Sequence, residues 1–257
     1  MPTIKLKGYT VEYFDGDIDL LPVERYQKFN QAVAVESGIG SDMQAIDKHV
    51  SRSTMYAHKG MLDEHDKQNE ALRQCVWMVI KGINPRMSAF WFLVESINGK
   101  PFNDYSQENI DRWTARVSRA GLTQRIVNKL INAVKKKVAV ELDKFFPELN
   151  ANEGQIEVNT ITAQRTRLIL RGMINGDAPD EIFKKIQGID DHLLNFNQPA
   201  NWSGEKSKEV ELVTTYQNTM AILSERLGRD AKKLTVMEYY TNLSLLKKQA
   251  KANQKRA

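Results

Sequence analysis

The stretch ESGIGSDMQ, residues 36–44, is the part of this chain most similar to a phosphate-binding loop, because two glycines flank an isoleucine before a Ser-Asp pair. A dinucleotide-binding fingerprint needs a third glycine after a strand, and a phosphate loop needs Gly-Lys-Ser/Thr. Neither is present. We therefore interpret the stretch as a helix-helix corner, in which Gly38 ends one helix and Ser41, with Gln44 three residues later, caps the next. An exposed helix N-terminus can still hold an anion.

Four histidines and an acidic cluster raise the question of a metal site. They are His49, His58, His65 and His192, and the cluster DEHD contains His65. His58 and His65 are seven residues apart, but Gly60 separates them, and the usual paired-histidine spacings are absent. Acidic residues are also favoured in the first turn of a helix, which explains the cluster without a metal. We predict no metal site.

Nucleophilic catalysis has no recognisable pattern in this chain. The Gly-x-Ser-x-Gly elbow is absent, and the single cysteine, Cys75, lies in the apolar run CVWMVI, as a small buried core residue would. One cysteine also excludes an internal disulfide and a Cys-based zinc site. We predict no catalytic residues and no cofactor, and hence a protein that is not an enzyme. Paired carboxylates that only the fold brings together stay open.

Basic residues are the remaining chemical signal, and they are unevenly placed. Of the 37 Lys and Arg residues, five lie in the last eleven, which contain no acid, so the rest of the chain carries 32 against 32 acidic residues. A second basic set lies within the stretch NKLINAVKKK. The candidate contacts to nucleic acid or to an acidic partner are Lys129, Lys135, Lys136, Lys137, Lys247, Lys248, Lys251, Lys255 and Arg256.

Both basic sets have a second interpretation. The lysines of residues 129–137 could form the solvated polar face of a helix, or contact phosphates with strong salt dependence. The tail from about residue 247 could be a frayed helix end, or an arm that lies on nucleic acid or an acidic protein surface.

Hydrophobic periodicity predicts the elements that would position these residues. TIKL and YTVEY alternate apolar and polar residues around Gly8, which predicts an N-terminal β-hairpin. Helical spacing predicts a helix from Pro22 to Gly38 and an especially apolar one over PRMSAFWFLVESING, residues 85–99. The longest predicted helix, Thr123–Phe146, would extend about 35 Å.

The second half of the chain continues with helical patterns. The last of them begins with a capping box, in which Thr235 and Glu238 satisfy each other's backbone. Pro147 and the polar PELNANEGQ indicate a domain boundary near residue 150. We expect a mainly α fold: residues 1–150 form a β-hairpin and a helical bundle, and residues 151–257 form a second, smaller helical domain with the basic tail.

Membrane and export signals are absent from the pattern. No apolar run approaches the roughly 20 residues that span a bilayer, and the N-terminus lacks the apolar block of a signal peptide. We expect no membrane partner.

Several stretches together resemble a known class of proteins. IKLKGYTVEYF, LPVERYQKFN, SGIGSDM, INPRMSAFWFLVESINGKPFNDYS and LTVMEYYTNLSLLKKQ resemble small helical proteins from the structural gene blocks of tailed bacteriophages. The resemblance implies a noncatalytic virion protein, such as a head-tail connector or accessory subunit. It would be made in the host cytoplasm and act in the virion as a homo-oligomer bound to other phage structural proteins.

Two other functions stay open at this point. One is a tail assembly chaperone, which would be absent from the mature virion. The other is a nucleic-acid-binding protein that uses the basic tail, in which case the tail would contact DNA.

Overall fold

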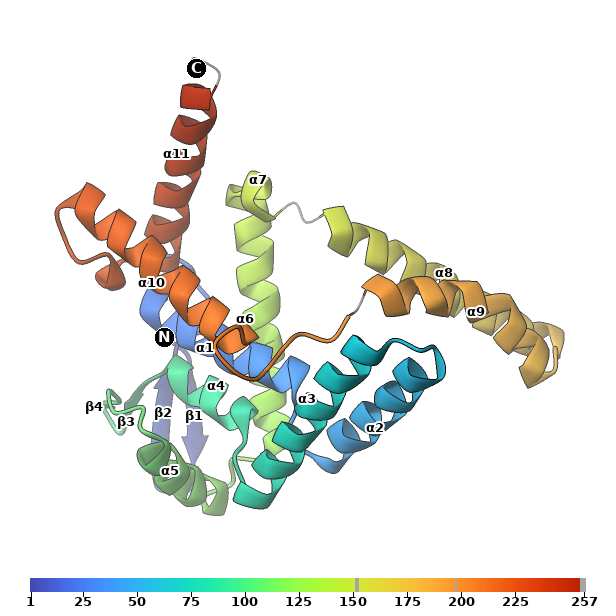
Figure 1. The fold of residues 1–257 in the computed structure, drawn as a ribbon. Coiled ribbons are helices and arrows are strands. Elements are labelled where there is room, and N and C mark those ends of the chain that lie inside the picture. The colour runs from blue at the N-terminus through green and yellow to red at the C-terminus, as the bar shows by residue number, and fades with distance from the viewer. Residues whose placement is uncertain (151–152, 197, 255–257) are drawn as a thin grey trace. The chain divides into compact units, whose positions relative to one another are not determined.

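The computed structural model describes residues 1–150, 153–196 and 198–254, and it is mainly α, as the sequence predicts (Figure 1). The chain forms two compact units. Unit 1 comprises residues 1–149 and 200–257, and unit 2 comprises residues 150–199. We expected residues 151–257 to form one domain, whereas residues 200–257 belong to the same unit as the N-terminal half.

Unit 1 contains most of the helices and all four strands that the described residues form. The strands are β1 Thr3–Leu6, β2 Tyr9–Tyr13, β3 Val94–Ile97 and β4 Lys100–Pro101. The helices are α1 Val23–Gly38, α2 Met43–His58, α3 Leu62–Lys81, α4 Pro85–Leu93, α5 Gln107–Arg119, α6 Gln124–Phe145, α7 Pro147–Asn150, α10 Lys208–Leu227 and α11 Val236–Gln254, with a 3-10 turn at Ala231–Lys233.

The predicted N-terminal hairpin is confirmed, and it belongs to a larger sheet. The strand order is β1-β2-β3-β4, antiparallel throughout, with a register shift between Glu12 and Tyr13 of β2. Because the sheet has four strands and the side chain of Val11 in β2 is fully buried in the core, the hairpin does not have to be stable alone.

The helix predicted over residues 85–99 is wrong in its second half. It ends at Leu93, and Val94–Ile97 form strand β3, paired with β2. Asn98 and Gly99 both have positive φ, 51° and 73°, which is the geometry of a two-residue Asn-Gly hairpin turn. The β-branched residues of β3 and this turn favour a strand, but a short apolar run cannot be told from a helix by periodicity alone.

Side-chain caps define where several helices begin. Ser106 and Thr123 each accept a hydrogen bond from the backbone three residues later, at the start of α5 and of the long helix α6. The predicted capping box is confirmed at the start of α11: Thr235 N donates to Glu238 Oε2 at 2.9 Å, and Glu238 N donates to Thr235 Oγ1 at 3.3 Å.

The chain returns to unit 1 because its C-terminal segment completes the core there. Val23 N donates to Leu234 O, and Val236 N donates to Leu21 O, both at 2.9 Å. The side chains of Leu234 and Val236 are almost completely buried. These contacts join residues more than 200 positions apart, so local sequence patterns could not predict them.

Arg25 of α1 ties the sheet to the helices. Its guanidinium donates to the carbonyl of Val94 and pairs with Glu95 at 3.2 Å. It also lies over the rings of Phe14 and Tyr105, 5.2 and 5.6 Å from their centroids. A largely buried guanidinium that is hydrogen-bonded and stacked in this way fixes the position of α1 on the sheet.

Unit 2 is a hairpin of two helices, α8 Glu153–Asn175 and α9 Pro179–Phe196 (Figure 1). Gly172 allows the helices to approach closely, because a Cβ at this position would lie 2.6 Å from Ile182 Cγ1. Arg165 pairs with Asp190 across the hairpin. The only large hydrophobic side chains that are buried among its described residues are Ile186 and Leu194.

Candidate interaction site at the α1–α2 corner

The corner between α1 and α2 is formed by the stretch ESGIGSDMQ, and it is a helix-helix corner as predicted. The residue that makes the turn is Gly40, whose φ is +75°. A Cβ on Gly40 would also lie 2.4 Å from the side chain of Ala45. Gly38, the predicted end of the helix, is the last residue of α1 but has ordinary helical geometry.

Gly38 has a different role, which is to make room for Trp202. A Cβ on Gly38 would lie 2.0 Å from Cζ2 of the indole. Trp202 is buried there in a small core with Ile39, Ala71 and Cys75, which confirms Cys75 as a core residue.

The cap of α2 is Asp42, and the prediction of Ser41 in this role is wrong. Asp42 Oδ1 accepts from Ala45 N at 2.8 Å, whereas Ser41 Oγ donates to Glu36 Oε2 at 3.1 Å. Both side chains could cap a helix, but α1 places the Glu36 carboxylate within reach of the serine. Ser41 therefore ties the end of α1 to the start of α2.

Glu36 is the most enclosed charge at the corner. Its side chain is 11% exposed and pairs with Arg86 of α4, with 2.5 Å between Oε1 and Nε. Burial raises the pKa of the Glu36 carboxyl, and the Arg86 guanidinium and the Ser41 hydroxyl oppose this effect. Arg86 also approaches Asp42 at 3.8 Å, so it links the corner to α4.

His49 of α2 is buried beneath the corner and acts as a neutral hydrogen-bonding group. Its Nε2 contacts Ile39 O at 2.6 Å, and its Nδ1 contacts the side-chain nitrogen of Gln68 from α3. Since the amide nitrogen can only donate, Nδ1 accepts and Nε2 carries the proton. Burial lowers the pKa of His49, the bond to Ile39 opposes this, and Lys48 and Arg52 lower it further.

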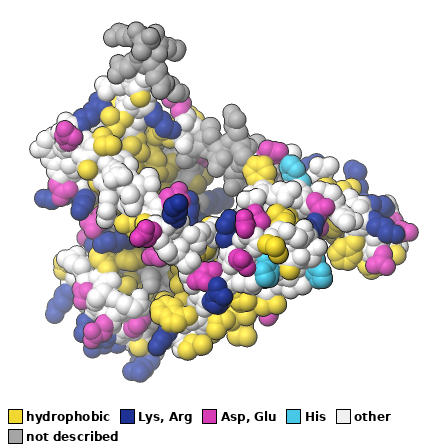
Figure 2. Space-filling model, viewed as in Figure 1, with side chains coloured by type: hydrophobic (Ala, Val, Ile, Leu, Met, Phe, Trp, Pro, Cys, Tyr) yellow, Lys and Arg dark blue, Asp and Glu magenta, His cyan; other side chains and the backbone are white. Residues whose placement is uncertain are grey.

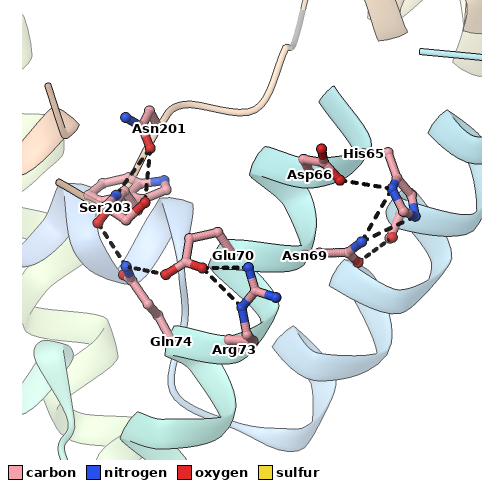
Figure 3. Close-up of polar contacts among 10 residues, drawn as sticks. His65, Asp66, Asn69, Glu70, Arg73, Gln74, Asn201 and Ser203 are labelled. Carbon is pink, nitrogen blue, oxygen red and sulfur yellow. Dashed lines mark hydrogen bonds and ion pairs between the residues drawn. The ribbon is translucent and has the colours of Figure 1, made fainter. Parts of the chain in front are cut away.

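Polar side chains of α3 hold the segment that carries Trp202 (Figure 3). Gln74 Nε2 donates to the carbonyl of Trp202 at 2.8 Å, and Gln74 is itself near Glu70, which pairs with Arg73. Asn201 Oδ1 accepts from the backbone of Ser203 at 3.1 Å. These bonds fix the loop so that the indole stays against α1.

The acidic cluster DEHD lies at the start of α3 and does not gather a metal site. His65 contacts Asp66 at 3.5 Å and Asn69 at 3.1 Å (Figure 3). Asp63 and Glu64 lie in the first turn of α3, where acids are favoured. Within the described ranges, no group of three or more His, Cys, Asp and Glu residues has the geometry to hold a metal ion.

Two adjoining cavities open beside the corner. The first, which we call the corner cavity, has a volume of about 490 Å³ and lies between α1, α2, α4 and α6. The second has a volume of about 360 Å³ and is lined by the corner itself and by α2. Glu36, Ser37, Lys48 and Arg86 line both cavities. The predicted basic residue Lys135 of α6 lines the corner cavity.

The other basic residues that the sequence analysis singled out lie in different environments. Lys137 pairs with Asp15 at 2.9 Å and so is a structural residue. Lys129 and Lys136 of α6, and Lys247 and Lys248 of α11, are exposed. The side chain of Lys251 and the residues Lys255 and Arg256 lie outside the described part of the chain. Contact of any of these residues with nucleic acid stays a prediction.

Lys48 and Arg52 are candidate site residues that the sequence analysis missed. They lie one turn apart on α2, and Lys48 lines both cavities while Arg52 lines the second. The i,i+4 spacing of two basic residues was visible in the sequence, but nothing local shows that α6 and α4 complete a cavity around them.

Apolar side chains are exposed on the α8–α9 hairpin and on α3. On unit 2 they include Leu170, Met173, Ile174 and Phe183, and on α3 they include Trp77 and Ile80. Figure 2 shows hydrophobic side chains at the surface over the α8–α9 hairpin, among charged ones. Ile174 is 83% exposed.

Comparison with protein family models, with characterised proteins and with solved structures finds no match to this chain. Among the described residues, no helix is both long and apolar enough to cross a membrane.

Proposed function

We propose that this protein is a noncatalytic assembly subunit that acts through contacts with other protein chains, in the manner of a head-tail connector or accessory subunit of a tailed phage. The observation that carries the proposal is the apolar surface of unit 2. Its two helices expose Leu170, Met173, Ile174 and Phe183, and the large hydrophobic side chains buried among its described residues are only Ile186 and Leu194.

The physical argument concerns the stability of unit 2. A segment of 50 residues is close to the lower limit at which a single hydrophobic core keeps a domain folded. Burying a large aliphatic or aromatic side chain contributes about 1.5–3 kcal/mol. A partner that covers Ile174 and Phe183 would therefore stabilise the hairpin substantially, and solvent contributes nothing comparable.

The phage context rests on the sequence resemblance described above, including the stretches IKLKGYTVEYF and LTVMEYYTNLSLLKKQ. Both stretches form parts of unit 1: the first forms the β1-β2 hairpin and the second begins the C-terminal helix α11. In the proposal, unit 1 is the scaffold and unit 2 provides the apolar contact with a neighbouring subunit.

The test is the mass of the purified full-length chain, measured by multi-angle light scattering over a range of concentrations. We expect oligomers larger than the 29.4 kDa monomer, and we expect Ile174→Glu to shift them toward the monomer. Gln164→Glu is the matched control, because it adds the same charge to an exposed position of α8. A wild-type chain that stays monomeric at every concentration would contradict the homo-oligomeric form of the proposal.

A further inference from the structure

We propose that the corner cavity binds a small phosphorylated ligand, and that Lys48 and Lys135 are its main cationic contacts, with Arg52 adding positive charge from the adjoining cavity. This inference does not depend on the assembly role. It rests on three features of unit 1. The cations have no acidic partners, the carboxylate that lines the cavity is already paired with an arginine, and uncharged hydrogen-bond donors line the same cavity.

The first feature is that the cations have no carboxylate partner. Among the described residues, no Asp or Glu oxygen lies within 4.0 Å of the side-chain nitrogens of Lys48, Arg52 or Lys135. Lys137, only two residues from Lys135, does have such a partner in Asp15. Among the described residues, Lys129 and Lys136 of α6 have no such partner either, and Lys135 differs from both in that it lines the cavity.

The second feature is that the negative charge in the lining of the cavity is already neutralised by an arginine. Glu36 is the carboxylate in the lining of the corner cavity, and it pairs with Arg86. With that pair subtracted, Lys48 and Lys135 leave the lining with two positive charges. An anion bound in this volume would be attracted by both ammonium groups.

The surroundings of Lys48 agree with this picture. Burial lowers the pKa of the Lys48 ammonium, and the neighbouring Arg52 lowers it further. Both causes disfavour the charged lysine in the free protein. A bound anion favours the charged form, so binding would relieve an existing electrostatic cost.

The third feature is a set of uncharged donors. Asn128 and Asn132 of α6 line the corner cavity. The side-chain oxygen of Asn128 accepts from Gln124 at 2.9 Å, which leaves its amide NH₂ group to donate. Ammonium and amide donors around one volume are the groups that recognise phosphate oxygens. The volume of about 490 Å³ lies within the range of pockets that bind small molecules.

A small ligand fits these observations better than a nucleic acid duplex. Lys129 and Lys136 are exposed on the same helix as Lys135, but neither lines the cavity. A duplex backbone would contact exposed lysines along α6 without distinguishing those that line the cavity. A ligand inside the cavity would contact only Lys135 among these three.

Isothermal titration calorimetry of the full-length chain with sodium pyrophosphate tests the proposal. We expect saturable binding at low ionic strength, and a loss of affinity of about tenfold in Lys48→Ala and in Lys135→Ala, as for a charge-assisted hydrogen bond. Lys136→Ala is the matched control, because it removes the same charge from the next residue of the same helix. Its affinity should change less than twofold.

A second titration with a short DNA duplex separates the two sources of phosphate. Because Lys48, Lys135 and Lys136 are all exposed, the variants should fold, and circular dichroism checks this. The proposal is overturned if pyrophosphate does not bind, or if Lys136→Ala weakens pyrophosphate binding as much as Lys135→Ala does. Duplex binding in the absence of pyrophosphate binding would likewise overturn it, in favour of a nucleic acid surface.

Discussion

The indole of Trp202 lies against the Cα atom of Gly38, so closely that a methyl group on this glycine would lie 2.0 Å from Cζ2, 2.5 Å from Cε2 and 2.9 Å from Nε1 of the ring. The contact joins the end of α1 to a segment that follows unit 2 in the chain. It is one of the contacts that bring residues 200–257 back to unit 1.

Gly38→Ala should therefore destabilise the protein. The indole is rigid and 9% exposed, so relieving the clash must displace either the ring or the corner, at a cost of about 1–3 kcal/mol. Urea denaturation measures this change in the free energy of unfolding. In a Trp202→Ala background the same substitution should cost little, and an equal cost in both backgrounds would show that the indole is not the cause.

Leu234→Ala should be strongly destabilising if the C-terminal segment completes the core of unit 1. Leu234 is 1% exposed, and removing a buried leucine side chain costs about 2–5 kcal/mol. Leu245→Ala is the comparison, since Leu245 of α11 is 47% exposed and its substitution should cost about 0.5 kcal/mol or less. Similar midpoints of chemical denaturation for the two variants would argue against this packing.

Arg25→Met should cost about 2–4 kcal/mol, because it leaves the carbonyl of Val94 without its donor and Glu95 without its cation. Lys28→Met provides the control one turn later on α1. Lys28 forms an i,i+4 pair with Glu24, which contributes about 0.2–0.5 kcal/mol, and lies 5.0 Å from the centroid of the Tyr105 ring, a contact worth about 0.5–1 kcal/mol at an exposed site. The prediction fails if the two substitutions shift the thermal unfolding midpoint equally.

His49 should make the stability of the protein depend on pH. Because burial lowers its pKa in the folded state, the unfolded chain binds the proton more readily. The contribution of His49 is therefore present above the unfolded pKa of about 6.5 and is lost as the pH falls below that value toward the folded pKa. His49→Gln should weaken this dependence, whereas a variant of the exposed His58 should retain it. The measurement is the free energy of unfolding of both variants from about pH 7.5 to about pH 5. This range includes the unfolded histidine pKa of about 6.5.

Much of the helical architecture could be predicted from local patterns. The long helix α6, the hairpin around Gly8 and the capping box at Thr235 are all defined by residues close in sequence. The prediction of one helix over residues 85–99 is wrong because the composition of this apolar stretch suits a helix and a buried strand equally. The Asn98-Gly99 turn was the signal that could have separated them.

The candidate site depends on distant contacts that a single sequence does not show. The sequence predicts that Ser41 caps α2. In the fold the Ser41 hydroxyl donates to Glu36, and Asp42 caps α2 instead. Lys135 and Lys137 look alike in the sequence. Only the fold places one of them in a cavity with Lys48 and the other beside Asp15.

The proposed assembly role places this chain in a phage particle, and the most direct test is the protein composition of purified particles of that phage, measured by quantitative mass spectrometry. The proposal predicts that the chain is present in mature particles in a fixed number of copies per particle. Its absence from mature particles, with the chain found only in unassembled material, would contradict a structural subunit and indicate an assembly chaperone instead.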